Sequence, residues 1–129
     1  MRNPKQIKMS ESKNSKQYDL EDRTLQFAKK VREFIRKLPK TKSNFEDISQ
    51  LIRSSGSIGA NYIEANESFS KKDFILRIKI SRKEAKESRF WLKLVEINDD
   101  LELEEERGVL IKEVTELMNI FGSIIRKSE

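Results

Sequence analysis

Apolar side chains recur at every third or fourth position in four stretches of the chain, and this spacing predicts four amphipathic helices. The first helix is expected over residues 20–38, because Pro39 cannot continue it. The second and third are expected to begin at capping boxes that start at Ser43 and Ser70. The fourth follows the polar turn at Asn98. Four such helices with short links predict an all-α, antiparallel up-down-up-down four-helix bundle, and a three-helix array with a swapped fourth helix is the alternative.

The same spacing identifies the side chains that should face the core. In the first helix they are Leu20, Thr24, Phe27, Val31, Phe34 and Leu38. In the third helix they are Phe74, Ile78, Ser81, Ala85, Ser88, Leu92 and Val95. Because this second set contains serines and an alanine, the third helix can approach a neighbouring helix closely.

The middle of the second helix is unusually thin, because Gly56 and Gly59 stand among serines and an alanine. A glycine inside a helix costs about 1 kcal/mol relative to alanine. Close approach of another helix would offset this cost, so we expect close helix packing at both glycines. The small residues Ser81, Ala85 and Ser88 of the third helix could face this thin stretch. The alternative is a helix that kinks or breaks at Gly56.

Residues 1–17 show no apolar periodicity and are rich in Lys, Ser, Asn and Gln. They hold five Lys or Arg and one Glu, which gives a net charge of +4. A segment of this composition cannot bury a core of its own. We therefore expect residues 1–17 to be a disordered basic tail, and residues 18–129 to be the four-helix bundle domain.

The chain of 129 residues contains no cysteine and no histidine. It therefore lacks a thiolate nucleophile, the sulfur ligands of zinc sites, and the commonest general base. We expect a protein that is not an enzyme and has no cofactor. Its uncharged stretches are about half of the roughly 20 residues that a membrane span requires, and residues 1–17 lack the apolar core of a secretory signal. These features predict a cytoplasmic protein without a membrane partner.

The net charge of +5 is unevenly distributed. Residues 23–93 contain eighteen basic and eight acidic side chains, a net +10, whereas residues 94–129 contain four basic and ten acidic, a net −6. A surface of this kind neutralises phosphates and binds nucleic acid with little sequence preference. The candidate nucleic-acid-binding residues are Lys71, Lys72, Lys79, Arg82, Lys83 and Lys86. The alternative is a solvated helix face with Lys–Glu pairs.

Three glutamates on the second and third helices raise the question of a carboxylate metal site. Sites of that kind in helical bundles also use Glu-x-x-His motifs, and the chain has no histidine. We therefore expect no metal, and instead a structural polar network in which carboxylates pair with a neighbouring arginine. The expected members of this network are Arg53, Asn61, Glu64, Glu84 and Glu87.

The run Arg-Ser-Ser-Gly-Ser-Ile-Gly-Ala-Asn over residues 53–61 is more specific than amphipathic periodicity requires. Together with Ser-Lys-Lys-Asp-Phe at 70–74, Lys-Glu-Ala-Lys-Glu at 83–87 and the following Trp91, it resembles the bacterial proteins encoded by intervening sequences of 23S ribosomal RNA genes. Members of that family are sometimes labelled ribosomal proteins. The resemblance extends over about residues 18–127 and implies an antiparallel four-helix bundle.

Members of that family are also similar to the accessory protein of diversity-generating retroelements, a barrel-shaped homopentamer that binds a reverse transcriptase and nucleic acid. This similarity implies that the chain forms a homopentamer. Independently, Phe90, Trp91 and Leu94 broaden the apolar surface of the third helix beyond one stripe. A second apolar surface of this kind is typical of a contact with a partner, and burial within the same chain is the alternative.

Two classes of function fit these features. The first is a homo-oligomeric accessory protein that binds RNA through a basic helical surface. The second is a protein-interaction scaffold that does not bind nucleic acid, whose basic face meets an acidic protein such as the acidic fourth helix of a neighbouring copy. Salt-dependent RNA binding would separate the two classes.

Overall fold

The computed structural model describes residues 4–129, with side chains described from Leu20 onward, and it consists of helices and short connections. The helices are α1 (Pro4–Arg36), α2 (Lys42–Asn66), α3 (Lys71–Leu94) and α4 (Leu101–Ser128). No strand occurs within residues 4–129. None of these helices is long and apolar enough to cross a membrane.

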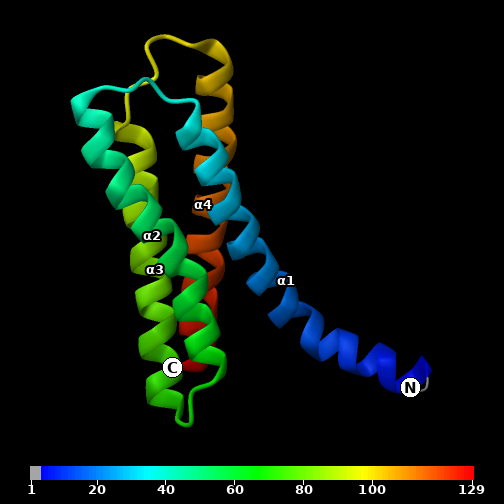
Figure 1. The fold of residues 1–129 in the computed structure, drawn as a ribbon. Coiled ribbons are helices and arrows are strands. Elements are labelled where there is room, and N and C mark those ends of the chain that lie inside the picture. Colours follow the sequence, from blue (N-terminus) through cyan, green and yellow to red (C-terminus); the bar gives the residue numbers. More distant parts are fainter. Residues whose placement is uncertain (1–3) are drawn as a thin grey trace.

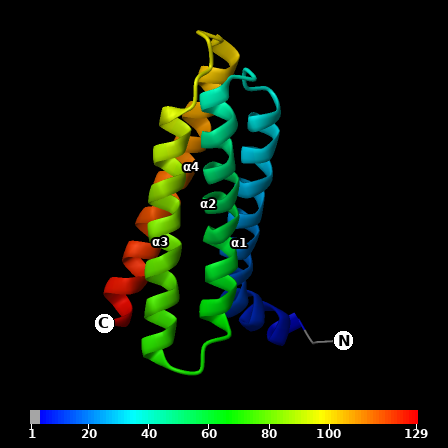
Figure 2. The same cartoon turned by 60° about the vertical axis from the view of Figure 1, so that its left-hand side comes forward.

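Consecutive helices run in opposite directions and lie side by side in the order of the chain (Figures 1 and 2). The α2–α3 pair packs most extensively and the α3–α4 pair comes next, whereas α1 makes less extensive contacts with α2 and α4. The four helices therefore close into the predicted antiparallel up-down-up-down bundle, with the apolar faces of all four directed inward. Within one chain α4 packs against both α1 and α3, so the bundle has no missing side for a swapped helix to fill.

The first helix starts earlier than the sequence analysis expected. Its backbone is helical from Pro4, and its first turns extend away from the other three helices (Figure 1). Residues 4–17 were expected to be disordered, and residues 1–3 of that expected tail lie outside the described residues. Helical backbone is possible here because proline is favourable in the first turn, and no further proline or glycine occurs before Pro39. Among the described side chains, which begin at Leu20, Leu20 itself is buried.

The sequence predicted the N-terminal cap of α3 correctly and that of α2 incorrectly. Ser70 caps α3 as expected, since its hydroxyl accepts a hydrogen bond from the Asp73 backbone N–H at 3.1 Å. The expected cap at Ser43 is wrong, because Thr41 caps α2 and accepts from the Asn44 N–H at 3.1 Å. The hydroxyls of Thr41 and Ser43 are two positions apart, and either could act as the N-cap of α2. The Asn44 side chain is held by hydrogen bonds, and this places its backbone N–H within reach of the Thr41 hydroxyl.

Asn44 is a fully buried polar residue that joins the two connections at one end of the bundle. Its side-chain amide donates to the carbonyl of Pro39 at 3.0 Å and to the carbonyl of Glu96 at 2.9 Å. Its Oδ1 accepts from the Glu96 N–H at 2.8 Å. All three hydrogen bonds go to backbone atoms, so Asn44 holds the α1–α2 and α3–α4 connections together.

Small polar residues line the contact between α2 and α3. The Ser88 hydroxyl donates to the Ser54 hydroxyl at 2.8 Å, and the Ser81 hydroxyl donates to the Ile58 carbonyl at 3.0 Å. All of these residues are fully buried. The short side chains bring the two helices close, and the hydrogen bonds satisfy the buried hydroxyls, as a packed interior requires.

The two glycines of α2 face α1 rather than the small residues of α3. A Cβ on Gly59 would lie 2.7 Å from Thr24 Oγ1 and 3.1 Å from Thr24 Cβ, so α1 approaches closely at this position. A Cβ on Gly56 would meet only Arg32, at 3.7 Å, which is an ordinary contact distance. The helix continues through both positions from Lys42 to Asn66 without a break. Close helix packing is thus found at Gly59 with α1 as the partner, whereas the small residues of α3 meet Ser54 and Ile58 on a different face of the same stretch of α2.

Candidate nucleic-acid interface

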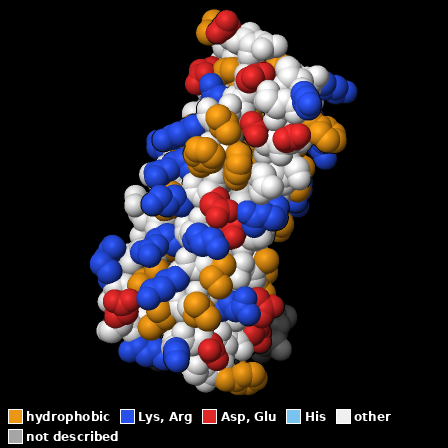
Figure 3. Space-filling view, turned by 90° about the vertical axis from the view of Figure 1, so that its left-hand side faces the viewer, with side chains coloured by type: hydrophobic (Ala, Val, Ile, Leu, Met, Phe, Trp, Pro, Cys, Tyr) orange, Lys and Arg blue, Asp and Glu red, His pale blue; other side chains and the backbone are white. Residues whose placement is uncertain are grey.

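The six candidate nucleic-acid-binding residues, at positions 71, 72, 79, 82, 83 and 86, all lie on α3 and are all exposed. Their spacing places them on one side of this helix, away from the buried Ile78, Ala85 and Leu92. We call these six residues the α3 stripe. In Figure 3 the basic side chains follow one another along the edge of the molecule over most of the length of the bundle. The structure thus places the six cations on one continuous surface.

The positive charge of the α3 stripe is hardly neutralised by carboxylates of the same chain. Within residues 20–129 the only ion pair made by a member of the stripe joins Lys79 Nζ to Glu129 Oε1, at 3.7 Å. Both of these side chains are about half exposed, so the pair is screened by solvent. The arrangement differs from a helix face built of Lys–Glu pairs, and it leaves the stripe able to accept anions.

Other cations form ion pairs that connect helices of the bundle. Arg23 of α1 contacts Glu113 at 2.7 Å and Glu116 at 3.0 Å, and Lys37 contacts Glu106 at 3.1 Å. The hydrogen bonds that Arg23 donates to the Glu113 carboxylate raise the pKa of Arg23. These pairs connect α1 to α4, so part of the acidic surface of α4 faces α1 of its own chain. The α3 stripe has no comparable acidic neighbour among the described residues.

Three members of the expected polar network come together between α2 and α3. Arg53 contacts Glu84 at 3.1 Å and Glu87 at 2.7 Å, and Glu84 is buried whereas Arg53 is half exposed. The hydrogen bond that Arg53 donates to the Glu87 carboxylate raises the pKa of Arg53. A buried carboxylate needs such a partner, since an unpaired buried charge is strongly destabilising. The arrangement is structural, because both carboxylates are occupied by the guanidinium group.

The remaining two members lie outside this cluster. The Asn61 carbonyl oxygen accepts from Arg77 at 3.2 Å, and its amide donates to the Ser57 carbonyl at 2.9 Å. Glu64 is exposed, and its carboxylate makes no ion pair within residues 20–129. The single network is therefore wrong for Asn61 and Glu64, because they follow Arg53 by two and three turns of α2 and so lie about 12 and 16 Å further along the helix axis. In the same part of the chain no three acidic side chains converge as metal ligands would.

Residues 16–123 match the family model described as 23S rRNA-intervening sequence protein. The chain belongs to this family. A solved structure of a protein of unknown function from the S23 ribosomal protein family of Bacteroides thetaiotaomicron is similar in sequence and fold. The two are 33% identical, the TM-score is 0.72, and the match covers 82% of this chain and 97% of the solved one. No curated protein matches the chain.

The family match covers the α3 stripe and the Arg53 cluster but not residues 1–15. Neither the family description nor the description of the solved protein names an enzymatic reaction. The similarity therefore establishes the family and the helical bundle, while the role of the basic surface depends on the geometry of this chain.

Two apolar surfaces remain exposed on the bundle. Phe90 and Leu94 of α3 are about half exposed, whereas Trp91 packs partly against the core and meets Phe90 edge-on, with ring centroids 5.0 Å apart. A groove of about 350 Å³ runs between α1 and α2. Its apolar and small lining residues are Leu25, Ala28, Gly56, Gly59, Ala60 and Ile63. Helical periodicity did not indicate this groove, because its two walls come from different helices.

Proposed function

We propose that this protein is a cytoplasmic, non-enzymatic, homo-oligomeric bundle that binds RNA through the α3 stripe. The observation that supports this most directly is the row of six exposed cations on α3, of which only Lys79 has a carboxylate partner among the described residues. Unneutralised like charges on one helix face repel each other, and a bound phosphate backbone would remove this repulsion. The net +10 of residues 23–93 supports the same conclusion.

Binding of this kind depends on phosphates and on shape rather than on base sequence. The bundle contains no sheet or zinc module of the types that read base edges, so the lysines and arginines of the stripe would contact the backbone of the RNA. Such contacts release condensed counterions and are weakened by salt. The expected ligand is therefore RNA with a continuous row of phosphates, bound with modest sequence preference.

A salt titration of RNA binding tests this function. We expect the logarithm of the association constant to fall linearly with the logarithm of the salt concentration, because each phosphate contact releases counterions. Filter binding or fluorescence anisotropy with the purified full chain gives the slope. A folded protein that shows no affinity for RNA at low salt would exclude this function and favour the protein-interaction scaffold.

The scaffold is the second candidate function, and the exposed Phe90 and Leu94 favour it. Both side chains lie on α3, the helix that carries the stripe, so an acidic protein could bury the apolar residues and pair with the cations in one contact. The phosphate backbone of an RNA would not bury these apolar residues. Loss of a protein partner after Phe90→Ser, with RNA affinity unchanged, would assign this surface to the scaffold function.

The homo-oligomer is proposed on the groove between α1 and α2. Leu25 and Ile63 line it and are half exposed in the single chain, as expected of residues that a neighbouring copy covers. The resemblance described above implies five subunits, and this number is part of the proposal.

We expect the unaltered chain to show the mass of several subunits in light scattering, and the double variant Leu25→Asp, Ile63→Asp to show the 15.2 kDa mass of one chain. Burying two unpaired carboxylates would make the contact unfavourable. Val109→Asp is the matched control, since Val109 is equally exposed but lies on α4 outside the groove. A monomeric unaltered chain at micromolar concentration would refute the oligomer.

A further inference from the structure

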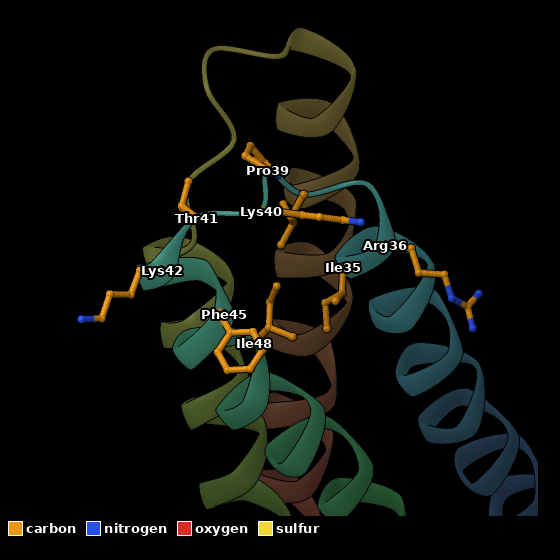
Figure 4. Close-up of a pocket in the computed structure, with 9 residues that line it drawn as sticks. Ile35, Arg36, Pro39, Lys40, Thr41, Lys42, Phe45 and Ile48 are labelled. Carbon is orange, nitrogen blue, oxygen red and sulfur yellow. The ribbon is translucent and has the colours of Figure 1, made fainter.

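A second basic feature lies at one end of the bundle, where α1 ends and α2 begins. A pocket of about 590 Å³ opens there between the two helices (Figure 4). Ile35 of α1 and Ile48 of α2 point into the space between the helices, and the ring of Phe45 lies beside Ile48. Phe45 is 79% exposed, although it stands in the first turn of a helix that packs into the bundle. An aromatic ring left open in this way offers a flat apolar surface to a ligand.

The charged residues that line this pocket are all cations. They are Arg36, Lys40 and Lys42, and no carboxylate lines the pocket. In Figure 4 the Lys40 side chain lies across the mouth, whereas Arg36 and Lys42 point outward on opposite sides. A linear polyanion that crosses the pocket would therefore meet a cation on either side of the aromatic ring, with Lys40 at the mouth between them.

The cations stand at an end of α2 where positive charge is unfavourable. The amide dipoles of a helix make its N-terminus positive, and acidic residues in the first turn usually compensate for this. The first turns of α3 and α4 contain Asp73 and Glu102, but the first turn of α2 contains no acid and begins with Lys42. A bound anion would supply the missing negative charge. The N-terminus of α2 should therefore attract phosphate more strongly than the N-termini of α3 and α4, whose first turns already contain acidic residues.

The position of Phe45 is fixed by its neighbour in the chain. The buried Asn44 side chain is held by three hydrogen bonds to the backbone of Pro39 and Glu96. The backbone of the first turn of α2 is thus tied to both connections at this end of the bundle. Because this backbone is already fixed, a ligand that stacks on the Phe45 ring does not have to order it, and binding costs less conformational entropy.

We propose that this pocket receives an unstacked base of single-stranded RNA, with the base stacked on Phe45 and the flanking phosphates near Arg36, Lys40 and Lys42. The inference rests on the RNA binding proposed above and adds a preference for unpaired nucleotides. Stacking of bases on exposed aromatic rings between cations is the usual way in which proteins hold single strands. A duplex keeps its bases stacked inside, so it would use the α3 stripe but not this pocket.

The experiment compares Phe45→Ala with Phe69→Ala in the full chain. Phe69 is the matched control, because it is a fully exposed phenylalanine at the opposite end of the bundle, in the α2–α3 connection. The probes are a single-stranded oligouridine of about ten nucleotides and an RNA duplex of similar length. We expect Phe45→Ala to lower affinity for the single strand about 5- to 100-fold, because one stacking contact is lost. Affinity for the duplex and the slope of the salt dependence should not change, since no charge is removed.

Phe45→Tyr, which keeps the ring, should bind the single strand as the unaltered chain does. Equal single-strand affinity of Phe45→Ala and the unaltered chain would overturn the pocket while leaving RNA binding by the α3 stripe intact. A lower oligomeric mass of Phe45→Ala in light scattering, with unchanged RNA affinity, would also overturn it and assign the pocket to a protein contact. If the unaltered chain binds neither probe at low salt, the proposed function itself fails.

Discussion

Reversing four cations of the α3 stripe should abolish RNA binding without unfolding the bundle. The variant combines Lys71→Glu, Lys72→Glu, Lys79→Glu and Arg82→Glu, all at exposed positions. Each phosphate contact contributes about 0.7 to 0.9 to the slope of the double-logarithmic salt plot, so four contacts account for about three units of the slope of the unaltered chain, and any residual binding of the variant should lack them. The new carboxylates would in addition repel the phosphates. The measurements are fluorescence anisotropy for affinity and circular dichroism for helicity.

The bundle should tolerate these changes, because none of the four side chains packs into the core. The one ion pair lost, between Lys79 and Glu129, is exposed and long, and pairs of that kind contribute little to stability. A matched control reverses the same number of cations elsewhere, at Lys30, Lys112, Arg126 and Lys127, which are exposed on α1 and α4. If the control loses as much affinity as the stripe variant, binding follows net charge rather than the stripe. Unchanged affinity in a folded stripe variant would favour the scaffold function.

Replacing Asn44 by alanine should strongly destabilise the bundle, although Asn44 belongs to no expected site. The substitution removes two donors and one acceptor from a fully buried position and leaves the carbonyl and the N–H of Glu96 without their partner, whereas the Pro39 carbonyl keeps the Thr41 N–H at 3.0 Å. Unsatisfied buried groups of this kind cost about 1–3 kcal/mol each when no water replaces the partner. We expect the free energy of unfolding to fall by about 2–4 kcal/mol.

Urea unfolding followed by circular dichroism measures this loss. Ser43→Ala is the control, because Ser43 is the neighbouring residue in the same turn and its side chain is exposed. Surface substitutions of that type usually change stability by less than about 0.5 kcal/mol. A loss in Asn44→Ala no larger than in the control would show that the two connections are held by other contacts.

Helix number and the inward face of each helix followed from the sequence alone. All six side chains expected to face the core in the first helix are buried, and so are Ile78, Ala85 and Leu92 of the third. The cap at Ser70 was also predictable, since Ser70 opens the Ser-Lys-Lys-Asp capping signature and its hydroxyl accepts from the N–H three residues later. The clustering of the candidate cations on one side of α3 follows from their spacing. These features depend on the 3.6-residue period of the helix, which is a local property of the chain.

The tertiary structure determined which faces of the helices contact each other. It placed Gly59 against Thr24 of α1, chose Thr41 over Ser43 as the cap of α2, and paired Asn61 with Arg77 of α3. It also assembled the pocket at Phe45 and the groove at Leu25 from residues of two helices. Helical periodicity shows which side of a helix is apolar, but not the rotation or the neighbour of that helix in the bundle. Those depend on packing between distant segments, because ridges and grooves of several helices must fit together at once.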